Sequence, residues 1–221
     1  MIYSPENNFL LIKNFKVGST SLEIALSHLL PESAICTPIE MSNTYHPERN
    51  WKTDKYEFLN HSSYDDVKKV FGDEIIDNTV SAIFVRNPYE QVLSWFFHRI
   101  NEYNWKFDWN ALAKEQQELW IEKFFSEKDP MFCMLKSTKN LYTQGDKNLV
   151  SVNHVLRYEN GLENEINKIL SLVNLPAITI PYQEKNFKPK NIHYLDVFKE
   201  EHLTKIQEEW SWEFETFSYQ K

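Results

Sequence analysis

The chain has 221 residues, which is enough to bury a hydrophobic core without disulfide support. Hydrophobic residues make up 42% and charged residues 25%, a balance that excludes disorder as the general state. The net charge of -8 disfavours a nucleic-acid-binding protein, which needs a positive field to displace counterions. Because the sequence has two cysteines, no signal peptide and no apolar run of membrane-spanning length, we expect a soluble cytoplasmic protein without membrane insertion.

Two strand-turn-helix units are predicted in chain order. The first has a short apolar run at Phe9–Ile12, a turn, and a helical pattern over residues 22–30 that ends before Pro31. The second has a β-branched, apolar run over residues 79–85, a turn at residues 86–88, and a helical pattern over residues 89–103. The repetition of strand, turn and helix favours parallel strand pairing.

The other elements fit the same class. A helix capped by Ser62 or Ser63 is expected to run to Phe71, with helices over residues 110–125, 161–173 and 200–214, and a strand over residues 152–158. Residues 40–58 and 175–195 have an irregular pattern. The alternation predicts an α/β fold of three layers, with a mostly parallel central sheet flanked by helices. Since no linker or repeat divides the chain, we expect one domain over residues 1–221.

The first turn has the composition of an anion-binding loop. It supplies a glycine, backbone N–H groups at a helix start, hydroxyl donors and one cation. Its residues are Lys16, Val17, Gly18, Ser19, Thr20 and Ser21. An ordinary turn, with Thr20 or Ser21 as the helix N-cap and a solvated lysine, is the alternative. The lysine stands two residues before the glycine, so the motif of nucleoside triphosphate sites is absent.

The second turn places Arg86 at a strand end and Ser94 about two turns into the next helix. An arginine can hold a phosphate through two N–H groups, and a serine on the helix can donate a hydroxyl to the same phosphate. We therefore expect Arg86 and Ser94 to share one wall of a pocket. The alternative is a surface arginine and a serine that only packs.

Together the two turns resemble the donor-binding elements of sulfotransferases that use 3′-phosphoadenosine 5′-phosphosulfate (PAPS), particularly the carbohydrate-type branch and its bacterial relatives. Residues 16–21 resemble the family's 5′-phosphosulfate loop, and residues 84–89 with Ser94 resemble its 3′-phosphate element. Further similar segments are Asn60-His61-Ser62-Ser63, Leu156-Arg157-Tyr158-Glu159-Asn160 and residues 212–219. The resemblance extends from about residue 9 to residue 219.

The resemblance implies a P-loop-like fold and transfer of a sulfuryl group from PAPS to a hydroxyl of a small-molecule or saccharide acceptor, with 3′-phosphoadenosine 5′-phosphate (PAP) as product. Residues 16–21 would bind the 5′ end of the donor, and Arg86 with Ser94 would bind the 3′-phosphate. His61 is the candidate base, because an imidazole of ordinary pKa accepts a proton near neutrality. Lys16 would stabilise the leaving oxygen. A structural histidine that caps the following helix is the alternative for His61.

The sequence departs from the family pattern at several positions: Phe15, Ser19, Gln91, Glu213 and Ser218. Ser19 replaces a glycine, and a serine there would cost about 1 kcal/mol if the position required a positive φ. The roles of Arg157, of Glu159 and of the lysines at 185, 188 and 190 are left open by the pattern.

Two other functions fit parts of the sequence. A P-loop nucleotide or small-molecule kinase would use the same loop, although the second strand ends in Arg86 where magnesium-dependent phosphoryl transfer generally needs a carboxylate. A nucleotide-binding module without catalysis would explain the departures at Phe15, Ser19 and Gln91. We expect no metal, since the histidines have no partners at ligand spacing.

Overall fold

The computed structural model describes residues 1–39, 48–103, 108–126, 137–144, 149–180 and 188–221. These residues form two compact units, each made of two stretches of chain. The first comprises Met1–Arg86 and Thr138–Gln183, and the second comprises Asn87–Ser137 and Glu184–Lys221. The single domain expected over residues 1–221 stays a prediction.

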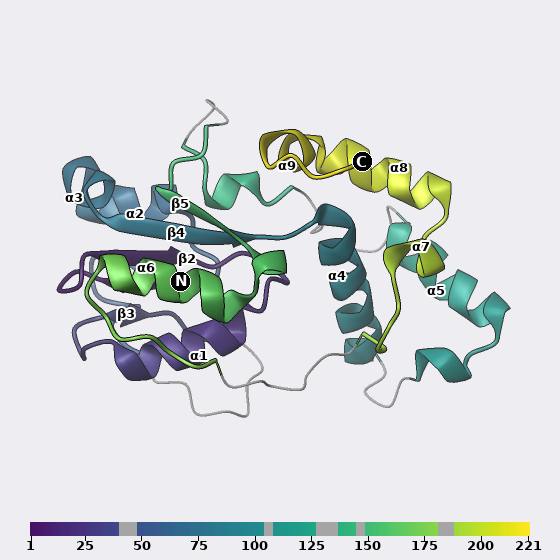
Figure 1. Ribbon diagram of the computed structural model, residues 1–221, viewed down its shortest axis with the longest axis horizontal. Coiled ribbons are helices and arrows are strands. Elements are labelled where there is room, and N and C mark those ends of the chain that lie inside the picture. Colours follow the sequence, from purple (N-terminus) through teal and green to yellow (C-terminus); the bar gives the residue numbers. More distant parts are fainter. Residues whose placement is uncertain (40–47, 104–107, 127–136, 145–148, 181–187) are drawn as a thin grey trace. The chain divides into compact units, whose positions relative to one another are not determined.

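The first unit is built on a five-stranded sheet (Figure 1). Its strands are β1 (Ile2–Ser4), β2 (Phe9–Ile12), β3 (Ile35–Cys36), β4 (Val80–Val85) and β5 (His154–Arg157), in the spatial order β3-β1-β2-β4-β5. The pairs β2–β4 and β4–β5 are parallel, whereas β1 is antiparallel to both β2 and β3. The α/β class is confirmed, and the sheet is mixed.

The expectation of a mostly parallel sheet was therefore wrong, and the short link between β1 and β2 is the reason. Only residues 5–8 join the two strands, with the N–H of Asn8 donating to the Pro5 carbonyl and Asn8 itself at a φ of 51°. A parallel pair needs a crossover of a dozen or more residues, so this tight turn can only return the chain antiparallel. The strands β1 and β3 are three and two residues long, too short to show a two-residue period in the sequence.

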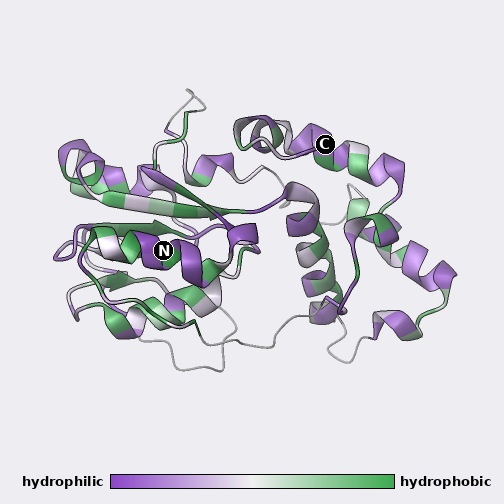
Figure 2. Cartoon of the chain, viewed as in Figure 1, coloured by the Kyte–Doolittle hydropathy of each residue, from purple (hydrophilic) through white to green (hydrophobic). Residues whose placement is uncertain are grey.

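Helices cover both faces of this sheet. On one face lie α1 (Ser19–Leu29) and α6 (Leu162–Leu172), which share a buried apolar cluster with alternate residues of the strands, including Phe9, Leu11 and Phe84. On the other face lie α2 (Tyr64–Phe71) and α3 (Asp73–Asp77), where Phe71 contacts the ring of Tyr3 at 4.9 Å. Figure 2 shows the strands as predominantly hydrophobic, as expected for a sheet covered on both sides.

The second unit is helical. It contains α4 (Pro88–Tyr103), α5 (Lys114–Phe125), α7 (Tyr194–Val197), α8 (Glu200–Glu209) and α9 (Ser211–Thr216), packed on a core rich in aromatic residues. The helix expected over residues 200–214 is divided at Trp210, and the one expected from residue 110 is preceded by a 3-10 turn at Trp109–Ala111. Among the described residues, no helix has the length and apolar character needed to cross a membrane.

Candidate anion-binding and active site

The loop between β2 and α1 has an unusual backbone. Lys16 and Gly18 both adopt positive φ, 54° and 72°, and Gly18 is the N-cap of α1. The helix therefore begins at Ser19, two or three residues earlier than it would with Thr20 or Ser21 as its N-cap. Gly18 has no side chain to satisfy the N–H groups of the first helical turn, which lack partners inside any helix. With no acidic residue in that turn, the end of α1 suits an anion.

Gly18 is also fixed by its surroundings. A Cβ atom at this position would lie 2.5 Å from Cδ1 of Leu162 and 3.5 Å from Cε2 of Tyr158. Tyr158 begins a 3-10 turn (Tyr158–Asn160) after β5, and Leu162 begins α6. The sequence thus needs glycine here for two reasons, the left-handed backbone and the close approach of a neighbouring turn.

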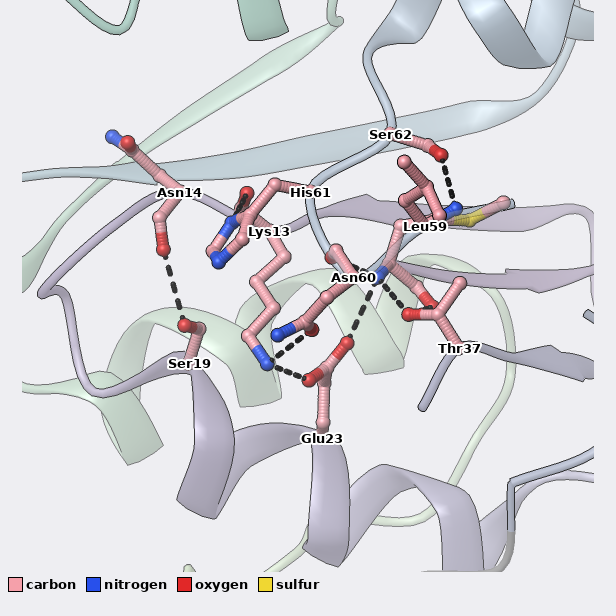
Figure 3. Close-up of polar contacts among 10 residues, drawn as sticks. Lys13, Asn14, Ser19, Glu23, Thr37, Leu59, Asn60, His61 and Ser62 are labelled. Atoms are coloured by element: carbon pink, nitrogen blue, oxygen red, sulfur yellow. Dashed lines mark hydrogen bonds and ion pairs between the residues drawn. The ribbon is translucent and has the colours of Figure 1, made fainter. Parts of the chain in front are cut away.

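A hydrogen bond between Asn14 and Ser19 joins the two ends of the loop (Figure 3). The Asn14 side chain donates to the Phe84 carbonyl at 3.0 Å and accepts from the Phe15 N–H at 2.7 Å. The buried Ser19 hydroxyl donates to the Asn14 carbonyl at 3.1 Å. The Ser19 proton is thus used by the protein itself, while Thr20 and Ser21 are half-buried on the same turn.

Arg86 lies beside this loop. One Nη donates to the Lys16 carbonyl at 3.0 Å, and the guanidinium carbon lies 4.4 Å from the centre of the Tyr158 ring. The structure thus brings together three predicted site residues of the first unit, Lys16, Gly18 and Arg86. Ser94 lies half-buried on α4 in the second unit, so its pairing with Arg86 stays a prediction.

His61 lies next to the start of the same loop. Its ring stacks on Phe15 at 3.7 Å, and its Nδ1 lies 3.0 Å from the Lys13 carbonyl. Because a carbonyl only accepts, Nδ1 carries the proton and Nε2 keeps its lone pair. Burial, followed by the nearby charge of Lys13, lowers the His61 pKa to about 4, so the ring is neutral at pH 7. Ser63, rather than His61, caps α2.

A buried charge cluster lies under His61, and the sequence analysis did not predict it. Lys13 Nζ contacts Glu23 Oε2 at 2.5 Å and Asn60 Oδ1 at 2.6 Å, and the amino group of Met1 contacts Glu23 Oε1 at 2.9 Å. Burial alone would raise the Glu23 pKa, but the two cations hold it below its ordinary value. The signal in the sequence was an acid on the apolar face of a helix, three residues before Leu26.

A second cluster, in the other unit, has donor atoms of the kind that bind metals. Glu122, Glu201 and His202 place their oxygens and a ring nitrogen within 4.8 Å of one another. Nδ1 of His202 accepts the Lys199 N–H at 3.1 Å, so Nε2 carries the proton and faces Glu122 at 3.4 Å. A metal would have to displace that proton, and the cluster is better explained as a capping histidine with an acidic partner.

The basic segment near residue 188 is partly accounted for. Lys188 forms an ion pair with Glu90 at 3.0 Å and also donates to the Ile192 carbonyl, which ties this segment to α4 inside the second unit. Lys190 is exposed, whereas Lys185 lies outside the described residues.

Comparison with known proteins gives one match. A family model, described as the sulfotransferase family, matches residues 1–220. A search of curated proteins and a search of solved structures found no match.

Proposed function

Because the chain belongs to the sulfotransferase family, which makes it a sulfuryl transferase, we propose that its donor is PAPS and its acceptor is a hydroxyl group of a saccharide. PAP would be the other product. The saccharide follows from the resemblance of the donor-binding turns to the carbohydrate-type branch. The residues proposed to act on the donor and acceptor, Lys16, His61 and Arg86, all belong to the first unit.

The observation that carries the donor assignment is the pairing of Arg86 with the β2–α1 loop. The Arg86 guanidinium is bonded to the Lys16 carbonyl, and the loop ends at the glycine-capped N-terminus of α1. A cation and a helix N-terminus thus lie side by side, which fits a donor that carries separate 5′ and 3′ anionic groups. When bound, PAPS would supply a sulfur joined through a bridging oxygen to the 5′-phosphate.

The residues have distinct tasks in the proposed reaction. The acceptor oxygen forms a bond to sulfur while the bond from sulfur to the bridging oxygen breaks. His61 Nε2 takes the proton of the acceptor hydroxyl; its ring is neutral at pH 7 and its Nδ1 proton is held by the Lys13 carbonyl, although a pKa of about 4 makes it a weaker base than the ordinary imidazole expected from the sequence. Lys16 stabilises the negative charge that develops on the bridging oxygen, and the N–H groups at the start of α1 hold the 5′-phosphate.

Calorimetry with PAP in magnesium-free buffer tests the donor site. We expect the wild type to bind PAP and Arg86→Ala to bind it at least about tenfold more weakly, equivalent to ~1.4 kcal/mol. Arg49→Ala is the matched control, because the Arg49 guanidinium also donates to backbone carbonyls, those of Leu30 and Pro31 at the opposite end of α1. Its affinity for PAP should stay unchanged.

The acceptor is tested by transfer of labelled sulfate from PAPS to a panel of saccharides and simple alcohols. Transfer that depends on His61 would support the whole proposal. Tighter binding of ATP with magnesium than of PAP would contradict the donor and favour a kinase. PAP binding without transfer to any acceptor would favour a nucleotide-binding module.

A further inference from the structure

Lys13 touches the candidate base segment in two ways. Its backbone carbonyl accepts the Nδ1 proton of His61 at 3.0 Å, and its ammonium group donates to the side chain of the preceding residue, Asn60, at 2.6 Å. One residue at the end of β2 therefore holds both Asn60 and His61. Figure 3 shows the Lys13 side chain extending from the strand past His61 to Asn60 and Glu23.

Glu23 connects this contact to α1. Its carboxylate, buried with none of the residue exposed, meets the Lys13 ammonium, which is itself 3% exposed. Glu23 stands on the second turn of the helix whose first turn forms the proposed anion site. A buried ion pair whose partners also make further hydrogen bonds holds both side chains in one arrangement, and here Glu23 bonds the Met1 amino group and Lys13 bonds Asn60.

We propose that Lys13 is a positioning residue that fixes the His61 ring relative to the N-terminus of α1, with Glu23 as its anchor and Asn60 as its second contact. This inference rests on the proposed function of His61 as the base. The buried ion pair of Lys13 with Glu23 would keep the Nε2 lone pair of His61 at a constant distance from the anion site. A displacement of about 1 Å between such groups can cost about 100-fold in rate.

The pKa of His61 depends on the charges around it and can be measured separately from activity. Lys13 and the Met1 amino group lower the His61 pKa, whereas Glu23 raises it. Removal of the Lys13 charge should therefore raise the titration midpoint of His61 above about 4. A lysine with a purely structural role elsewhere would not move that midpoint.

The test compares Lys13→Met with Lys68→Met. Lys68 is also a buried lysine in an ion pair, with Asp77 at 2.9 Å, and it lies in the same unit but outside the His61 contacts. In Lys13→Met, Glu23 keeps the Met1 amino group as its partner at 2.9 Å, so no carboxylate is left uncompensated. Asn60→Ala, which removes only the half-buried amide, is the second variant in case the first unfolds.

We expect kcat to fall about 10- to 100-fold in Lys13→Met and Asn60→Ala, with the PAP dissociation constant within about twofold of wild type. Lys68→Met should lose stability and keep its kcat. NMR titration of the His61 ring should show the raised midpoint in Lys13→Met alone.

An unchanged His61 midpoint in folded Lys13→Met, or equal kcat losses in Lys13→Met and Lys68→Met, would overturn the proposal. The NMR titration needs no substrate. If the wild type transfers no sulfate, the proposed function fails on its own evidence, and the titration still decides whether Lys13 controls His61.

Discussion

Substitution of Gly18 by alanine is the sharpest test of the loop, because two separate costs can be estimated. A φ of 72° places alanine in the left-handed region, which costs about 1–2 kcal/mol. The new Cβ would also lie 2.5 Å from Leu162 Cδ1. Because the half-buried Leu162 side chain can change rotamer, the steric clash should cost about 1 kcal/mol, the low end of the range for overpacking. The sum is about 2–3 kcal/mol, or about 4–12 °C in Tm for a chain of this size.

Gly72→Ala is the matched control for this variant. Gly72 has φ 88° and ψ 154°, a region open almost only to glycine, and a Cβ there would meet nothing within 4 Å. Its cost of about 1–3 kcal/mol is comparable, but it lies at the end of α2. We therefore expect both variants to lose stability, while only Gly18→Ala loses PAP affinity, at least about tenfold.

Chemical denaturation and calorimetry measure both quantities. In a Leu162→Ala background, the stability cost of Gly18→Ala should shrink by about 1 kcal/mol, because the clash is gone and the backbone strain remains. If Gly18→Ala binds PAP like the wild type, the loop is not the anion site. If its stability cost is the same in both backgrounds, the contact with Leu162 is not what makes glycine necessary.

Three further outcomes are expected. Arg86→Lys should weaken PAP binding at least about tenfold by calorimetry. Lysine has no planar guanidinium that could stack on Tyr158 and donate two parallel hydrogen bonds to a phosphate. Unchanged affinity would refute this reasoning. The acid limb of kcat/KM should lie near pH 4, the pKa of His61 in the folded protein. The free energy of unfolding should fall as the pH drops from 6.5 to 4, because His61 binds a proton near pH 6.5 in the unfolded chain but only near pH 4 in the folded protein. Denaturant titrations of wild type and His61→Gln check the second effect, and a limb at pH 6.5 would contradict the burial of the ring. Ser19→Gly should cost about 1 kcal/mol in thermal unfolding, since it removes the bond to Asn14, and a gain would be contrary evidence.

The sequence predicts local features of the candidate site, such as the β2–α1 loop, more reliably than contacts between distant residues. The place of Gly18 between a strand and a helix predicted a residue of positive φ, and its φ is 72°, whereas the binding of an anion by this loop stays a prediction. The concern over Ser19 was misplaced, because that residue is the first of α1 and is helical. The departure that does need a positive φ is Ser218, at 52°, after the end of α9. Whether Ser19 or Ser218 has a positive φ depends on where α1 begins and where α9 ends, and helix boundaries are the least certain part of a sequence prediction.

The parts that could not be predicted depend on contacts between distant residues. The antiparallel β1 is three residues long, and its place in the sheet is fixed by pairing with both β2 and β3. The ion pair of Lys13 with Glu23 joins a strand end to a helix, with Asn60 supplied from 47 residues away. No periodic pattern in the sequence predicts such a contact, and the one indication of it was the place of Glu23 on the apolar face of the helical pattern.

The position of Glu23 on α1 has a consequence for how the site is held together. The first turn of this helix faces the proposed donor, and its second turn holds the lysine that contacts His61. A helix is stiff over two turns, because successive backbone hydrogen bonds fix its rise and rotation. The separation between the proposed anion site and the proposed base, His61, is therefore determined within the first unit. Changes in loops that contact the acceptor should alter which hydroxyl is presented to His61 without altering the distance from His61 to the donor.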